Sequence, residues 1–192
     1  MFEIFVKYLT DKIILSNKEI HLIESVCNSK KLVKKQFLLQ EGDVFRYNAF
    51  VCSGLLKTFS VAENGSQHII NFASENYWAG DRESIINGTV SRFNIDAIEP
   101  TELILIEKTD FDEICLEIPQ LSQLVSQIIQ KSLIVSQSRI LANLSFTAEE
   151  KYESFLEKYP HIVNRIPQHM IASYIGITPE TLARLRRKRV MK

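Results

Sequence analysis

The sequence predicts an α+β fold in which an antiparallel β-roll (jelly roll) precedes one long helix and a compact helical unit. Three observations support this order. Short apolar runs separated by turn residues fill positions 32–107, positions 120–159 contain neither glycine nor proline, and short helical segments follow. Because a switch from strand to helix periodicity marks a change of architecture, we expect a strand-rich domain over residues 1–117, a linker helix over 118–142 and a helical domain over 143–192.

The strand-rich domain shows the turn pattern of an antiparallel barrel. The apolar runs Gln36–Gln40 and Ala49–Cys52 each stop at a glycine-containing turn, and Asn64-Gly65 separates two further runs. Asn-Gly between apolar runs is a strong hairpin signal, because a type I′ turn needs positive φ at both central positions. Several short strands at roughly ten-residue spacing are typical of a closed antiparallel architecture.

A long amphipathic helix is predicted from Pro119, a residue that suits the first turn of a helix. Apolar residues recur along it at spacings of three and four and occupy more than one side. One side can therefore cover the first domain while another meets a second copy of the chain. We expect a homodimer through Leu121, Leu124, Ile128 and Val135. The alternative is a helix that packs only on its own domain.

Residues 166–189 predict a helix-turn-helix, two short helices joined by a tight turn. Gly176 tolerates the positive φ of such a turn. Thr178 is a good N-cap for a second helix that starts at Pro179. This second helix can enter a major groove, where arginine bridges guanine O6 and N7 and a carboxylate accepts from cytosine N4. The residues expected to contact double-stranded DNA are Thr178, Pro179, Glu180, Thr181, Arg184, Arg187 and Lys188.

Further basic residues at the end of the sequence favour phosphate contacts. Arg186, Arg189 and Lys192 join Arg187 and Lys188 in this run, and such contacts supply affinity rather than sequence choice. The alternative is a solvated basic helix end that interacts favourably with the helix dipole.

The charge distribution supports the same division of the chain. With 23 basic and 23 acidic residues the formal charge is zero, which excludes a uniformly basic coat protein for nucleic acid. However, residues 1–142 carry 14 basic and 18 acidic side chains, whereas residues 143–192 carry 9 and 5. An acidic part therefore precedes a basic one, which is the part predicted to meet DNA.

Other classes of protein find little support. Three scattered cysteines without a CxxC pair predict neither a disulfide framework nor a zinc or iron–sulfur site. No apolar run reaches the length of about 18 residues that a membrane span needs, so we expect a cytoplasmic protein without a membrane partner. A cupin-type metal enzyme would need two or three histidines inside the barrel, but two of the four histidines lie in the helical part. We therefore expect no enzyme.

The order of strand-rich module, long helix and helix-turn-helix resembles the Crp/Fnr family of bacterial transcription regulators. The segment IASYIGITPETLARLRRK is particularly similar to members from Bacteroidetes-type bacteria, and so are Trp78–Asp81, Glu83-Ser84, Pro119 and Phe155–Pro160. The resemblance implies a sensory, cyclic-nucleotide-binding-like β-roll, a dimerisation helix, paired DNA-reading helices on a palindromic operator, and RNA polymerase as a further partner.

The resemblance also assigns roles within the reading helix. In family members the base-contacting positions correspond to Pro179, Glu180 and Arg184, and the first is usually polar or charged, so Glu180 and Arg184 are expected to be the main readers. Family members commonly continue into a two-stranded wing. This sequence ends at Lys192, so the resemblance implies a helix-turn-helix without a full wing.

For the β-roll the resemblance implies a ligand cassette with two departures. Family members carry a Gly-Glu pair whose acid contacts the ribose, then a short helix and an Arg-Ser pair that holds the cyclic phosphate. Here Gly80 and Asp81 give a shorter acid, and Ser91 and Arg92 stand in reversed order. Adjacent side chains of an extended segment point to opposite faces, so the reversal redirects the guanidinium.

Three alternatives stay open for this cassette: cyclic AMP in the usual mode, which is not favoured, a different small anionic ligand, or no ligand. Arg82 and Glu83 lie at the same rim and could serve a different ligand, and Arg92 could instead form a surface ion pair with Asp96. An alternative for the whole chain is a ligand-sensing module that acts through protein contacts without DNA. The basic second helix argues against that alternative.

Overall fold

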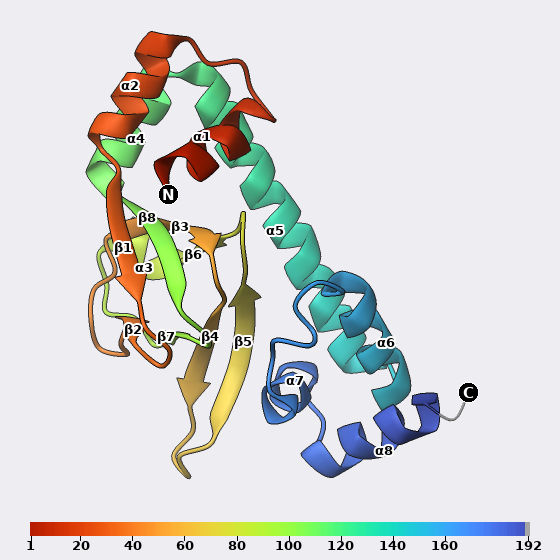
Figure 1. Ribbon diagram of the computed structural model, residues 1–192. Helices are drawn as coiled ribbons and strands as arrows, with labels where there is room; N and C mark the ends of the chain where they lie inside the picture. Colours follow the sequence, from red (N-terminus) through yellow and green to blue (C-terminus); the bar gives the residue numbers. More distant parts are fainter. Residues whose placement is uncertain (191–192) are drawn as a thin grey trace. The chain divides into compact units, whose positions relative to one another are not determined.

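The computed structural model describes residues 1–190 and has the predicted α+β fold (Figure 1). It divides into two compact units. The first holds residues 1–60 and 71–128, and the second holds residues 61–70 and the chain from residue 129 onward. The elements that pass from one unit to the other are strands β4 (Leu56–Val61) and β5 (Gln67–Ala73) and helix α5 (Pro119–Ser145).

The first unit is a β-roll of two four-stranded sheets. One sheet has the strand order β1-β8-β3-β6 and the other β2-β7-β4-β5, and the pairs that β7 and β8 make with their neighbours are antiparallel. Its further strands are β1 (Asn28–Leu32), β2 (Phe37–Leu39), β3 (Tyr47–Ser53), β6 (Trp78–Ala79), β7 (Asn94–Ala97) and β8 (Thr101–Glu107). Its helices are α1 (Phe2–Thr10), α2 (Asn17–Ser25), α3 (Arg82–Asn87) and α4 (Lys108–Glu117).

Alternation along β3 divides the apolar core of this unit into two layers, because successive side chains of a strand point to opposite faces. Ala49 and Val51 belong to a cluster with residues of β4 and β7, whereas Phe50 and Cys52 belong to a cluster with α1, α4 and the start of α5. Helices α1, α2 and α4 lie together at one end of strands β1 and β8 (Figure 1). The second cluster includes Trp78, which makes edge-on contacts with three phenylalanine rings.

The predicted hairpin between β4 and β5 is present, but its turn is not type I′. Gly65 has a φ of 80°, whereas Asn64 is not among the residues with positive φ. The loop instead closes through hydrogen bonds from Ala62 N to Ser66 O and from Gly65 N to Ala62 O. The side chain of Asn64 accepts from the backbone and the hydroxyl of Ser66. A longer loop needs only one left-handed residue, which the glycine supplies.

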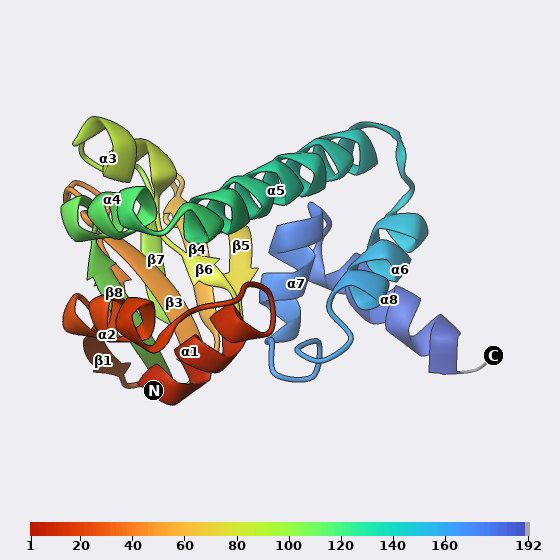
Figure 2. The same cartoon turned by 90° about the horizontal axis from the view of Figure 1, so that it is seen from above.

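The helical part of the second unit is built around three aromatic rings. Its helices after α5 are α6 (Ala148–Lys158), α7 (Gln168–Ile175) and α8 (Pro179–Val190), seen from above in Figure 2. The rings of Phe155, Tyr159 and Tyr174 lie 5.1–5.8 Å apart, and the two tyrosine hydroxyls are 3.1 Å apart. Ile171 and Leu182 are fully buried. These contacts fix α6, α7 and α8 as one folded body.

The predicted dimerisation face of α5 is wrong for Leu121 and Leu124. These side chains are only 1% and 6% exposed, and they are members of the core of the first unit, with Ile128 packed partly against the same core. Val135 lies 14 residues after Leu121, about four helical turns, and therefore on the same side of the helix. The amphipathic pattern that we assigned to a second copy thus covers the chain's own β-roll.

A second apolar stripe on α5 is exposed instead. It comes later in the helix and lies about 120–140° around the helix axis from Leu121, as the 3.6-residue repeat requires. Its members, all between 59% and 81% exposed, are Leu133, Ile134, Ile140, Leu141 and Leu144.

Candidate nucleic-acid interface and ligand cassette

The turn between α7 and α8 has the geometry that the sequence predicts. Gly176 adopts a φ of 71° at the end of α7, and Ile177 N donates to Ala172 O at 3.0 Å, which closes the helix in the manner of a Schellman motif. Thr178 Oγ1 accepts from Thr181 N at 3.2 Å and so caps α8. The two helices are therefore joined by a short, fully hydrogen-bonded turn.

Four of the predicted DNA-contacting residues lie together on one exposed face of α8. Glu180, Thr181, Arg184 and Arg187 line a shallow open depression of about 510 Å³, whereas Leu182 is fully buried against the core of the unit. The backbone N–H of Glu180 and the hydroxyl of Thr178 lower the pKa of the Glu180 carboxyl by hydrogen bonding. The face thus presents one carboxylate acceptor between two guanidinium groups.

The other basic residues of α8 are placed differently from these four. Lys188 Nζ lies 2.9 and 3.1 Å from the two carboxylate oxygens of Glu149 on α6. Arg186 and Arg189 come four and seven residues after Leu182, on the side of the helix that turns toward the unit's own core. Lys192, also predicted to meet phosphate, lies outside the described residues.

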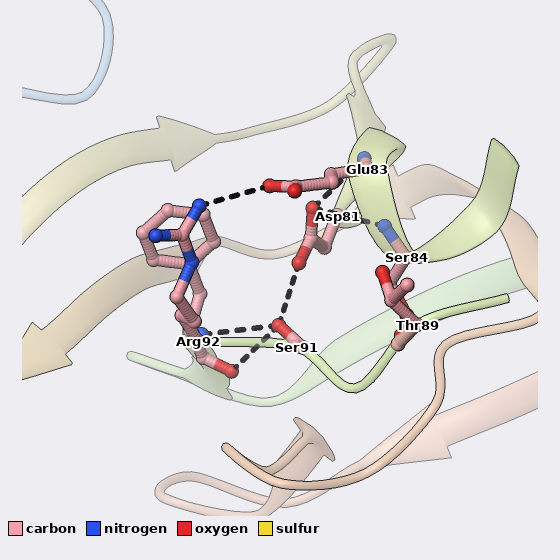
Figure 3. A network of polar contacts seen from close by, with 7 residues as sticks. Asp81, Glu83, Ser84, Thr89, Ser91 and Arg92 are labelled. Atoms are coloured by element: carbon pink, nitrogen blue, oxygen red, sulfur yellow. Dashed lines mark hydrogen bonds and ion pairs between the residues drawn. The ribbon is translucent and has the colours of Figure 1, made fainter. Parts of the chain in front are cut away.

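The ligand cassette of the β-roll is closed by its own hydrogen bonds (Figure 3). Asp81 is the N-cap of α3, and its Oδ1 accepts from Glu83 N at 3.0 Å and from Ser84 N at 3.4 Å. Its Oδ2 accepts from the hydroxyl of Ser91 at 2.7 Å. Asp81 and Ser91 are only 7% and 2% exposed. The acid that the resemblance assigns to a ribose is thus used inside the protein.

The guanidinium of Arg92 points away from Asp81 and Ser91. It forms an ion pair with Glu83 at 3.1 Å, and both side chains are largely exposed. Asp96, the partner considered from the sequence, instead pairs with Lys57. The reversed order of Ser91 and Arg92 therefore has the predicted consequence, because the hydroxyl takes the inner position and the guanidinium the outer one.

The loop before β3 covers the remaining polar groups of the cassette. Gly42 N donates to Ser91 O and Ser91 N donates to Asp43 O, both at 2.8 Å. Phe45 N donates to the hydroxyl of Ser84 at 2.8 Å. A Cβ atom on Gly80 would lie 2.8 Å from the ring of Phe45, so this ring occupies the space beside the glycine. The residues present do not fit a cyclic nucleotide in the family's usual mode.

A buried ion pair that the sequence did not indicate joins β4 to β7. Lys57 and Asp96 are opposite each other in the strand register, with Nζ 3.6 Å from Oδ2, and both are buried. Burial lowers the pKa of Lys57 and raises that of Asp96, and the opposite charge of each partner offsets part of this effect. The ring of Phe59 lies 4.3 Å from the ammonium group. Nothing ties this pair to the predicted cassette.

Two classes of site are not found among residues 1–190. No group of three histidine, cysteine, aspartate or glutamate side chains there is arranged to hold a metal ion. Over the same residues no helix is long and apolar enough to cross a membrane.

Comparison with known proteins gives matches of one kind. Residues 29–117 match the cyclic nucleotide-binding domain family. The chain is 28% identical over 179 residues to the transcriptional activator protein Anr of Pseudomonas protegens, a match that covers 85% of this chain and 71% of the relative. It is 26% identical over 183 residues to the regulatory protein HlyX of Actinobacillus pleuropneumoniae, covering 89% and 75%.

Solved structures share the fold. FixK2 from Bradyrhizobium japonicum superposes with a TM-score of 0.76 at 17% identity, over 86% of this chain and 85% of that one. The catabolite activator protein of Thermus thermophilus gives a TM-score of 0.58 at 18% identity, over 92% and 84%. At these identities the likeness shows the arrangement of the backbone.

Proposed function

Because the chain belongs to the Crp/Fnr family of DNA-binding transcription regulators, we propose that two copies bind a palindromic operator and read it with their α8 helices. The observation that carries this proposal is the exposed face formed by Glu180, Thr181, Arg184 and Arg187. It stands on a second helix held by a rigid turn, which is the geometry that enters a major groove. We assign the chain no catalytic role.

Arg184 and Glu180 are the proposed base readers. A guanidinium can bridge O6 and N7 of guanine, and an ionised carboxylate can accept from N4 of cytosine. Pro179 starts the helix without a polar side chain to offer, so the reading begins one residue later. Lys188 is held by Glu149 in the free protein, so we assign it a smaller share of the phosphate contacts than the sequence predicts.

Selection from a pool of random duplexes tests the proposal. We expect a palindrome whose half-sites lie about 34 Å apart, one helical turn. Arg184→Ala should relax the choice at one base pair and weaken binding by about 1–3 kcal/mol. Arg186→Ala removes the same charge from the other side of α8 and is the matched control. If the wild-type protein selects no sequence, the DNA-regulator function is refuted and a module that signals through protein contacts takes its place.

We propose that the second copy covers the exposed stripe on α5. Residues 130–138 are exposed on every side of the helix, and a helix turn carrying Leu133 and Ile134 in water is not expected to be stable alone. Leu141→Glu should therefore convert the dimer into a monomer in analytical ultracentrifugation. Val135→Glu places the same charge on the other side of the helix and should leave the dimer intact. The reverse pattern would restore the face predicted from the sequence.

We also propose that the β-roll does not bind cyclic AMP in the family's usual mode, because Asp81, Ser91 and Phe45 already satisfy one another or fill the space. Calorimetric titration with cyclic AMP should give no heat of binding, and micromolar affinity would overturn the proposal. A ligand elsewhere on the roll could regulate DNA binding only through a difference in affinity for two conformations. RNA polymerase remains a proposed partner on the strength of the family resemblance.

A further inference from the structure

The tip of the β4–β5 hairpin belongs to the same compact unit as the helix-turn-helix. The contact between them is made by Ser173 of α7. Its hydroxyl accepts from Ile69 N at 3.0 Å and donates to Gln67 O at 2.9 Å. The carbonyl of one residue and the amide of the next but one are the groups that a neighbouring parallel strand would take. Since β5 is an edge strand, the serine hydroxyl takes the place of a missing strand partner.

A second contact fixes the next residue of α7. The guanidinium of Arg139, on α5, donates to Ile70 O of the same hairpin. It also lies 5.5 Å from the centroid of the Tyr174 ring, within the range of a cation–π interaction. The hydroxyl of Tyr174 in turn contacts that of Tyr159 in the core of the helical part. Two successive residues of α7 are thus held, one by the hairpin backbone and one by α5.

We propose that Ser173 and Arg139 are positioning residues for DNA binding, which fix the helix-turn-helix on the β4–β5 hairpin. This inference rests on the function proposed above. The turn at Gly176 is short and hydrogen-bonded and Leu182 is fully buried, so α8 follows any displacement of α7. Strands β4 and β5 both continue into the first unit. The hairpin is therefore a covalent route from the β-roll to the reading helix.

Half-site spacing is the readout that separates positioning from ordinary stabilisation. In a dimer the orientation of each reading helix sets which separation of half-sites fits best. Binding is measured on a series of selected palindromes whose half-sites are moved apart or together by single base pairs. The wild-type protein should prefer one spacing sharply. Ser173→Ala should reduce that preference about tenfold, which corresponds to about 1.4 kcal/mol, the net worth of one to two hydrogen bonds.

Three further variants make the result specific. Ser173→Thr keeps a hydroxyl and should restore the spacing preference. Ser154→Ala removes a hydroxyl from an exposed position of α6 and should leave the preference unchanged. Arg139→Met keeps an apolar stem but loses the guanidinium, and it should weaken the preference as Ser173→Ala does. Amide exchange reports the contact directly, because Ile69 N–H should exchange slowly in the wild type and fast in Ser173→Ala.

The outcomes distinguish this inference from the function on which it rests. If the wild-type protein selects no operator, the proposed function is refuted and the positioning role with it. If it selects an operator and Ser173→Ala keeps the same sharp spacing preference, only the positioning role is refuted. Equal exchange of Ile69 N–H in both proteins would refute the contact itself, whatever the DNA measurements show.

Discussion

The bond between Ser91 and Asp81 gives the most direct test of whether the cassette is structural. Ser91→Ala removes a donor 2.7 Å from a buried carboxylate oxygen, and a hydrogen bond to a charged group contributes about 1.5–3 kcal/mol. The same hydroxyl accepts from Phe93 N at 3.0 Å, whose loss adds about 1 kcal/mol. The other oxygen of Asp81 keeps its bonds to the start of α3. We expect the free energy of unfolding to fall by about 2–4 kcal/mol.

Urea unfolding followed by the fluorescence of Trp78 measures this change. Trp78 is the chain's one tryptophan and belongs to the core of the first unit, so its signal reports on the β-roll. With a slope of about 1–3 kcal/mol per molar urea, the midpoint should move down by roughly 1–2 M. Ser29→Ala, at an exposed position of β1, should stay within about 0.5 kcal/mol of the wild type. If Ser91→Ala is equally neutral but abolishes binding of an anionic ligand, the cassette is a ligand site and the reasoning fails.

Three other predictions follow from charges and burial. Glu149→Gln should release Lys188, strengthen DNA binding and steepen its dependence on salt by about one phosphate contact, a slope change near 0.9; an unchanged slope in salt titrations would contradict this. Lys57→Met should lower the free energy of unfolding by about 3–5 kcal/mol, and adding Asp96→Leu should recover most of it, since an unpaired buried charge is worse than an apolar pair; chemical denaturation measures both. Burial raises the pKa of the Cys27 thiol to about 12, so iodoacetamide at pH 8 should label it only after unfolding. Stability should also fall as the pH rises from about 9 toward 12, because the unfolded chain loses this proton first.

The helix-turn-helix could be predicted because its signals are local. Gly176, Thr178 and Pro179 each act within one turn of their own position, and the structure places all three as their chemistry requires. The direction of α5 could not be predicted in the same way. Its apolar residues form two stripes with the same helical period, and the period does not say which stripe meets the β-roll.

The cassette was predictable in part. The reversed order of Ser91 and Arg92 correctly indicated that the guanidinium would leave the usual site. That the hydroxyl would then bond to Asp81 depends on a loop about forty residues earlier in the chain, whose backbone meets Ser91 only in the folded roll. The contact of Ser173 has no signal in the hairpin at all, since both of its partners there are backbone groups that every sequence provides.

The position of Arg139 suggests how two connections between the units are combined. Of the three segments that cross from one unit to the other, α5 carries Arg139, and β5 carries the carbonyl that its guanidinium bonds. The same side chain meets Tyr174 of the helix-turn-helix. A movement of the β-roll carried by α5 and one carried by the hairpin therefore act on α7 through adjacent residues. If they act together, the effects of Arg139→Met and Ser173→Ala on half-site preference should be less than additive in a double-mutant cycle, as residues in one network are. Full additivity would mean that the two connections work independently.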